Sequence, residues 1–227
     1  MTNGIKISEL FDLKETIAAN IFTGCEYPWE VLPKIKSFIL ELGATLPQNE
    51  YDHPADDIWI ARTATVYPSS YIHGPCIVGH YAEIRHCAFI RGSAIIGEHA
   101  VVGNSTELKN VILFNRVQAP HYNYVGDSIL GFKAHMGAGS ITSNIKSDKS
   151  LVHVLFNKQK IQTEMKKLGA LLGDHVEVGC NTVLNPGTIV GRNCIIYPLS
   201  LVRGYVPQDS IIKQNNAIVN KCNRGQA

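Results

Sequence analysis

An aliphatic side chain recurs at every sixth position along much of the chain. Nine consecutive positions of this register, from Ile60 to Leu108, are aliphatic, and a small residue such as Ala64 follows four places after each of the first eight. The register returns at Leu130 and again from Leu172 onwards. A period of six fits neither an α-helix nor a simple alternating strand. It indicates a short strand followed by a tight turn, which is the repeating unit of a parallel β-helix.

Three such units close one triangular coil, so residues eighteen positions apart should lie on adjacent coils about 4.8 Å from each other. Residues 114–124 (FNRVQAPHYNY) break the register, and we predict a loop that leaves the coil there. Residues 142–170 break it again, with the apolar segment LVHVLF at 151–156 and a charged run at 158–167. This second excursion is expected to include a β-hairpin. It is either a tolerated surface insertion or a functional loop.

The repeat region, residues 57–206, is flanked by two segments of different character. Residues 1–56 are predicted to be helical, because Pro28 suits the first position of a helix and apolar residues recur at helical spacing before Gly43. Residues 207–227 are predicted to be a polar C-terminal tail. The predicted fold class is therefore all-β, a parallel β-helix with a small N-terminal helical segment.

Composition narrows the function classes. Charged residues make up 18% of the chain and hydrophobic residues 45%, which excludes a disordered chain. The net charge is only +2, without blocks of like charge, so neither a nucleic-acid partner nor a membrane partner is expected. No apolar run is long enough to span a membrane. Six scattered cysteines without a CxxC pair indicate reduced thiols, and we expect a cytoplasmic protein.

Two cations depart from the repeat pattern. Arg91 and Lys109 each follow an inward aliphatic position, where a small residue is usual, and they are eighteen positions apart. His73 lies a further eighteen positions back. Stacked cations repel each other unless an anion lies between or above them, and a sugar phosphate would suit this place. The alternative is an ordinary solvated basic face.

Three motifs near these cations resemble a known family, the acetyltransferase domain of the bifunctional N-acetylglucosamine-1-phosphate uridyltransferase/glucosamine-1-phosphate acetyltransferases. The motifs are VGNSTELKN (102–110), APHYNYVGD (119–127) and MGAGSITSN (136–144). Their spacing agrees with the family without a gap from Arg91 to Asn144. The resemblance places the chain among the hexapeptide-repeat acyltransferases and implies that the β-helix is left-handed.

The resemblance also implies roles for individual residues. His121 matches the general base that removes a proton from the sugar amine, and Glu107 and Asn144 match residues that orient this histidine. His135 stands where the family has an asparagine that contacts the sugar. The substrate-binding positions implied are Arg91, Lys109, Tyr124 and His135, and those along the acetyl-CoA path are Ala138, Cys180 and Pro198.

The activity so implied is acetyl-CoA-dependent N-acetylation of an amino-sugar 1-phosphate, without a covalent enzyme intermediate and without a catalytic metal. Histidine is the usual base at neutral pH for an amine that attacks a carbonyl. A backbone N–H in the turn Gly137-Ala138-Gly139 could stabilise the oxyanion. Family members build their sites between subunits around a threefold axis, so we also expect a homotrimer.

Two other functions remain open. The chain could be a non-catalytic β-helix that binds a sugar nucleotide or partners a separate nucleotidyltransferase. A carbonic anhydrase of the same fold would need three zinc-binding histidines on adjacent coils, but His80, His86 and His99 do not fall in one stacked column. Residues 1–56 do not resemble the glycine-rich nucleotide loop of the family's first domain, so nucleotidyl transfer by this chain is not expected.

Overall fold

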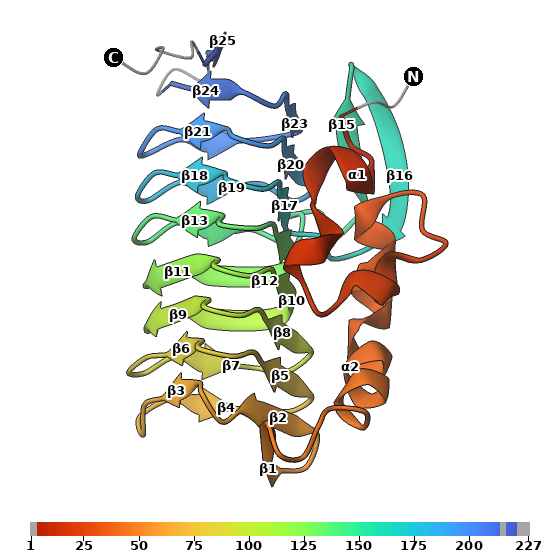
Figure 1. The fold of residues 1–227 in the computed structure, drawn as a ribbon. Coiled ribbons are helices and arrows are strands. Elements are labelled where there is room, and N and C mark those ends of the chain that lie inside the picture. Colours follow the sequence, from red (N-terminus) through yellow and green to blue (C-terminus); the bar gives the residue numbers. More distant parts are fainter. Residues whose placement is uncertain (1–3, 214–216, 222–227) are drawn as a thin grey trace.

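A column of stacked triangular coils forms the body of the protein (Figure 1). The structure is a computed structural model, and it describes residues 4–213 and 217–221. Each coil contributes strands to three flat faces, and neighbouring strands on a face run parallel. The prediction of an all-β, left-handed parallel β-helix with a small N-terminal helical segment is confirmed.

The three faces are named here by the order in which the chain visits them. The first face holds β2 (Ile58–Ala61), β5 (Cys76–Val78), β8 (Ala94–Ile96), the second halves of β10 (Glu107–Leu113) and β12 (Tyr124–Leu130), β17 (Ala170–Leu172), β20 (Thr188–Val190) and β23 (Tyr205–Val206). The second face holds β3 (Thr65–Val66), β6 (Glu83–Ile84), β9 (Val101–Asn104), β11 (Gln118–His121), β13 (His135–Met136), β18 (Glu177–Val178), β21 (Ile195–Ile196) and β24 (Ser210–Ile212). The third face holds β4 (Tyr71–Ile72), β7 (Phe89–Ile90), the first halves of β10 and β12, β14 (Ile141–Thr142), β19 (Val183–Leu184) and β22 (Leu201–Val202).

Residues 114–124 stay in the coil, so the prediction of a loop leaving it there is wrong. Gln118 pairs with Val101, seventeen positions earlier, whereas Ile95 pairs with Ile77 at the regular spacing of eighteen. The missing residue lies earlier, within β10, because Leu108 still pairs with Ile90 eighteen positions before it, whereas Val111 already pairs with Ala94 seventeen positions before it. The sequence period is broken, but the parallel pairing is not.

The β-helix also continues beyond residue 206, the predicted end of the repeat region. Ile211 of β24 pairs in parallel with Ile195, only sixteen positions earlier. A short antiparallel strand, β25 (Ile218–Asn220), then pairs with β24. The C-terminal boundary was placed too early, because a shortened coil does not keep the hexad register. The rest of the predicted tail, residues 214–216 and 222–227, lies outside the described residues.

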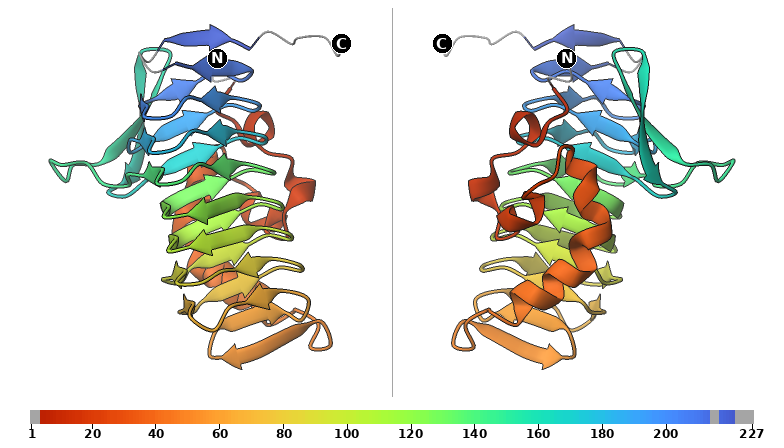
Figure 2. Two further views of the ribbon diagram at one scale, coloured as in Figure 1. Left: turned by 90° about the vertical axis from the view of Figure 1, so that its left-hand side faces the viewer. Right: turned by 90° about the vertical axis from the view of Figure 1, so that its right-hand side faces the viewer.

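The N-terminal segment covers the first face of the β-helix. It contains α1 (Ile7–Leu10), two short 3-10 turns (Leu13–Glu15 and Ala19–Phe22), a longer 3-10 helix (Pro28–Lys34) that begins at Pro28, and α2 (Ile35–Gly43). Helix α2 lies across β5, β8 and β10 (Figure 2). The middle residues of these strands, such as Ile77 and Ile95, point away from the coil interior and are still fully buried. Burial of each such side chain contributes about 1.5–3 kcal/mol. The prediction that residues 1–56 are helical is wrong at 51–55, where the chain forms one strand, β1 (Tyr51–Ala55), which pairs antiparallel with β2.

The second interruption of the repeat contains a β-hairpin, formed by β15 (Val152–Phe156) and β16 (Gln159–Met165). Strand β15 lies directly on two corner glycines, Gly187 and Gly204, both with positive φ near 78°. A Cβ atom at Gly187 would lie 2.8 Å from the carbonyl oxygen of His153, and one at Gly204 would lie 3.2 Å from that of Leu155. The glycines therefore allow the hairpin to pack against the corner between the third and first faces.

Candidate active site

The third face carries a cluster of polar side chains around β10 and β12. Glu107 and Lys109 flank the inward Leu108, and Tyr124 pairs in register with Glu107 on the next coil. Because side chains alternate along a strand, Glu107 and Lys109 both point outward from this face. The cluster consists of Arg91, Glu107, Lys109, Asn110, Tyr124, Asp127 and Asn144.

Arg91 forms an ion pair within this cluster. Its Nη1 atom donates to Glu107 Oε1 at 2.7 Å. The hydrogen bond to Glu107 raises the pKa of the exposed arginine above its usual value. The carboxylate that was predicted to orient the histidine base is therefore bonded to one of the two stacked cations.

Asp127 is the counterion of the second cation. Lys109 Nζ lies 3.0 Å from Asp127 Oδ1 and 3.2 Å from Oδ2, while Asn110 Nδ2 donates to Oδ1 at 3.0 Å and Asn144 Nδ2 to Oδ2 at 2.6 Å. The Asp127 side chain is only 5% exposed. Since both Arg91 and Lys109 have counterions in the chain, their stacking does not require an external anion.

Asp127 was missed by the sequence analysis, although it ends one of the quoted motifs. The sequence spacing could have predicted its contact with Lys109, because Asp127 follows Lys109 by eighteen positions, the usual spacing between residues on adjacent coils. The backbone register here is seventeen and pairs Lys109 with Gly126 instead. The long lysine side chain spans the difference of one residue.

Tyr124 and Asn144 complete the cluster. Asn144 Nδ2 donates to the Tyr124 hydroxyl at 3.1 Å. Burial raises the pKa of Tyr124, so its phenol stays protonated at neutral pH. A Cβ atom at Gly126 would lie 2.5 Å from the Tyr124 hydroxyl and 2.9 Å from Asn144 Nδ2, so only glycine leaves these two side chains in place.

His121 lies at the corner between the second and third faces, at the end of β11. The Gly139 amide donates to the carbonyl oxygen of His121 at 3.0 Å, the Asn181 amide to that of Ala138 at 2.8 Å, and the Leu199 amide to that of Cys180 at 2.9 Å. These bonds link successive coils at one corner. They align one column, called the corner column below, which consists of His121, Ala138, Cys180 and Pro198.

Most of the corner column is open to solvent. His121, Cys180 and Pro198 are exposed, and Ala138 is half-buried. The His121 ring forms no hydrogen bond with any residue that the structure describes. Neither Glu107 nor Asn144, the two predicted orienting residues, is bonded to it. The ring is therefore free to meet a substrate from solvent.

The turn at Ala138 offers one unused donor. The Gly137 amide donates to the carbonyl oxygen of Val178 at 2.7 Å, and the Gly139 amide donates to that of His121. Within residues 4–213 and 217–221, the Ala138 amide donates to no acceptor. Of the three amides considered for the oxyanion, this one remains available for a ligand.

His135 lies on the second face, away from the third-face cluster. It belongs to β13, and its Nδ1 atom lies 2.9 Å from Glu177 Oε2. The two residues are level on adjacent coils. One chain therefore brings together five of the predicted site residues on the third face and four in the corner column, but it leaves His135 apart from both.

Two further properties bear on the chemistry. Among the residues that the structure describes, no group of three or more His, Cys, Asp and Glu side chains is arranged to hold a metal ion. In the same residues, no helix is long and apolar enough to cross a membrane.

The chain is similar to known transferases. Residues 169–204 match the family described as bacterial transferase hexapeptide (six repeats). The bifunctional protein GlmU of Methanococcus maripaludis is 35% identical over 118 residues, which are 52% of this chain and 28% of that protein. The bifunctional sugar-1-phosphate nucleotidylyltransferase/acetyltransferase of Sulfurisphaera tokodaii is 35% identical over 101 residues, which are 44% of this chain and 25% of that protein.

Solved structures include a hexapeptide transferase family protein from Anaplasma phagocytophilum. It is 16% identical to this chain, with a TM-score of 0.40, and the match covers 68% of this chain and 72% of the other. The chain spans less than a third of the length of the two curated relatives. The family match and the two curated relatives confirm the resemblance to the hexapeptide-repeat transferases and to the bifunctional enzymes.

Proposed function

We propose that the protein is an acetyl-CoA-dependent N-acetyltransferase that acts on an amino-sugar 1-phosphate. The observation that carries this proposal is the corner column, which aligns the candidate base His121 with the three residues of the implied coenzyme path. A thioester that follows this column would end beside His121 and the free Ala138 amide. The similarity to the bifunctional acetyltransferases supports the same chemistry.

In the reaction, the sugar amine attacks the thioester carbonyl carbon. His121 takes the proton that the amine loses, because a neutral imidazole is an effective base near pH 7. The Ala138 N–H stabilises the negative charge that develops on the carbonyl oxygen. The tetrahedral intermediate then expels the coenzyme thiolate, which takes up a proton, and the N-acetyl sugar is released. No bond to the enzyme forms.

The acceptor would lie on the third face, where Arg91, Lys109 and Tyr124 offer donors. A bound phosphate would join the existing ion pairs with Glu107 and Asp127 rather than neutralise bare cations. His135 would reach the acceptor from the second face of another subunit. A homotrimer satisfies this requirement, because it would bring the second face of one protomer against the third face of the next. We further propose that the enzyme works without a catalytic metal and in the cytoplasm.

The test is a free-thiol release assay with acetyl-CoA and a panel of amino-sugar 1-phosphates. His121→Ala should reduce kcat by roughly 10²–10⁴-fold and leave acceptor binding nearly unchanged. Tyr122→Ala is a suitable control, because Tyr122 is a neighbouring side chain that is 65% exposed and has no role in the proposal. Undiminished turnover in His121→Ala would overturn the proposed mechanism.

One observation favours a non-catalytic sugar-nucleotide-binding or nucleotidyltransferase-partner module. The two cations of the third face and His135 all have carboxylate partners within the chain, as expected for a surface that is stable without a ligand. The same assay separates the two functions, since this module would release no thiol with any acceptor.

A further inference from the structure

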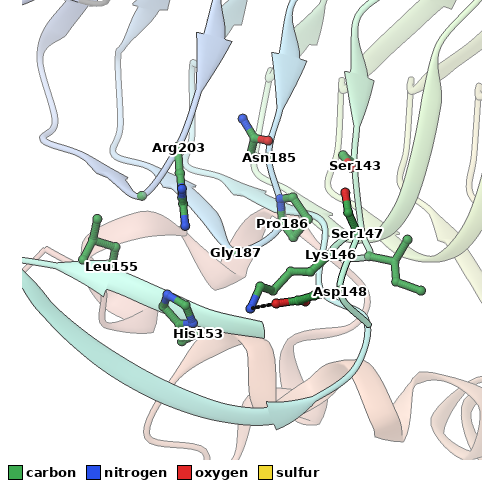
Figure 3. Close-up of a pocket in the computed structure, with 12 residues that line it drawn as sticks. Ser143, Lys146, Ser147, Asp148, His153, Leu155, Asn185, Pro186, Gly187 and Arg203 are labelled. Atoms are coloured by element: carbon green, nitrogen blue, oxygen red, sulfur yellow. Dashed lines mark ion pairs between the residues drawn. The ribbon is translucent and has the colours of Figure 1, made fainter. Parts of the chain in front are cut away.

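A cavity of about 320 Å³ lies between the hairpin and the corner that joins the third and first faces (Figure 3). The loop before β15 and strand β15 form one wall, and the corners of two later coils form the other. Lys146, His153 and Arg203 point into it from three separate segments (Figure 3). The corner column runs along the other edge of the third face, so the cavity is separate from the proposed coenzyme path.

The charge on the cavity wall is mostly positive. Arg203 forms no hydrogen bond or ion pair with any residue that the structure describes. Lys146 Nζ donates to Ser150 Oγ and lies 3.4 Å from Asp148 Oδ2. Asp148 is the one acidic side chain among the residues that line the cavity. One carboxylate thus faces two permanent cations and a histidine.

The pKa of the His153 imidazole responds to the positive charge of the cavity wall. Its pKa is lowered, first by burial and then by the nearby cations Lys160, Lys146 and Arg203, while Asp148 acts in the opposite direction. A positive potential at the imidazole disfavours its protonation. An anion placed between these groups would relieve that potential and would also supply acceptors for the unpaired guanidinium.

We propose that this cavity binds the phosphate group of a small phosphorylated molecule. A phosphate monoester carries close to two negative charges at neutral pH and offers three acceptor oxygens, which suits an arginine, a lysine and a histidine that converge. The volume is at the lower end of the range for small-molecule sites, which favours a small metabolite over a long coenzyme. The proposal does not depend on the acetyltransferase activity.

Two sources could supply this phosphate. One edge of the third face carries residues of both places, in the order Lys109, Gly126, Ser143, Asn185 and Arg203 on successive coils. The cavity therefore adjoins the proposed acceptor site. The phosphate could therefore belong to the acceptor itself, in which case the cavity, and not Arg91 and Lys109, would be its binding site. It could also belong to a separate ligand that binds beside the acceptor. The chemistry of the site is the same in both cases.

The first experiment measures binding of inorganic phosphate at pH 7.5 by calorimetry. Arg203→Gln and Lys146→Gln should each weaken binding about ten-fold or more, because each removes a charge-assisted hydrogen bond. Arg85→Gln is the matched control, since Arg85 is an arginine of the second face that is paired with Glu83. The proposal is overturned if the wild type does not bind millimolar phosphate, or if Arg85→Gln weakens binding as much as Arg203→Gln.

The second experiment follows the His153 ring by NMR during a pH titration with sulfate, which keeps its charge from pH 5 to 8. Bound sulfate should raise the pKa of His153, and Arg203→Gln should remove this effect. An unchanged His153 titration in saturating sulfate would contradict the proposal. The source of the phosphate follows from competition. If an amino-sugar 1-phosphate displaces inorganic phosphate and the free amino sugar does not, the acceptor is the source of the phosphate. If inorganic phosphate and the amino-sugar 1-phosphate bind at the same time, the cavity takes a separate ligand.

Discussion

Replacing Asp127 with asparagine is expected to destabilise the protein and to disturb the third face. The Asp127 carboxylate is 5% exposed and accepts hydrogen bonds from Lys109, Asn110 and Asn144. Asparagine has nearly the same shape, so the change removes the charge and turns one acceptor into a donor. In either orientation that donor would face the Lys109 ammonium, together with the side-chain amide of Asn110 or of Asn144.

The size of the effect follows from burial. Loss of a charge-assisted hydrogen bond costs about 1.5–3 kcal/mol. Breaking a fully buried ion pair costs about 3–5 kcal/mol, because the remaining charge is left without a partner. The Lys109 side chain is 28% exposed and can recover part of its hydration. We therefore expect Asp127→Asn to lower the free energy of unfolding by about 2–3 kcal/mol.

Urea unfolding followed by circular dichroism measures this loss. Glu83→Gln is the control, because its exposed ion pair with Arg85 should contribute no more than about 0.5 kcal/mol. Lys109→Met and the double variant complete a mutant cycle, in which the coupling between residues 109 and 127 should exceed about 1 kcal/mol. A loss as small as that of the control, or a coupling near zero, would refute the role assigned to Asp127.

Three further predictions rest on other parts of the molecule. Burial raises the pKa of Cys76 to about 12 and of Cys194 to about 11, so both thiols stay protonated at pH 8. Iodoacetamide should therefore label the exposed Cys87 and Cys180 first, and peptide mass spectrometry measures the order of labelling. Acetyl-CoA should protect Cys180 but not Cys87, and equal labelling of both with and without acetyl-CoA would count against the proposed coenzyme path. Light scattering should give a homotrimer, and a monomer at micromolar concentration would leave His135 without access to the acceptor.

The repeat made the fold predictable, because inward aliphatic side chains at every sixth position fit few other structures. The errors arose where the number of residues per coil changes. Parallel pairing needs matching strands and not equal turns, so Gln118 still pairs with Val101 after the loss of one residue. A search for a period of six reads that loss as the end of the repeat. The same cause hid β24 at the C-terminal end.

The site was predictable to a different extent. The family resemblance identified the four residues of the corner column and five of the seven residues of the third-face cluster, all but Asn110 and Asp127, and the structure brings each group together. The counterions were not predicted, because they depend on how long side chains reach between coils, as Lys109 does to Asp127. The separation of His135 was also not predicted, since a motif preserves spacing along the chain but not the face on which each residue lies.

The internal counterions decide which cation can report on acceptor binding. Lys109→Ala would leave the buried Asp127 carboxylate without its main partner, so any loss of affinity would be mixed with a loss of stability. Glu107 is 32% exposed and can be hydrated when Arg91 is replaced, at a cost of no more than about 1 kcal/mol. Arg91→Gln is therefore the cleaner probe. If Arg91→Gln weakens the binding of the phosphorylated sugar but not of the free sugar, Arg91 contacts the phosphate. If the affinities for both sugars fall equally, the stacked cations are a structural feature of the β-helix.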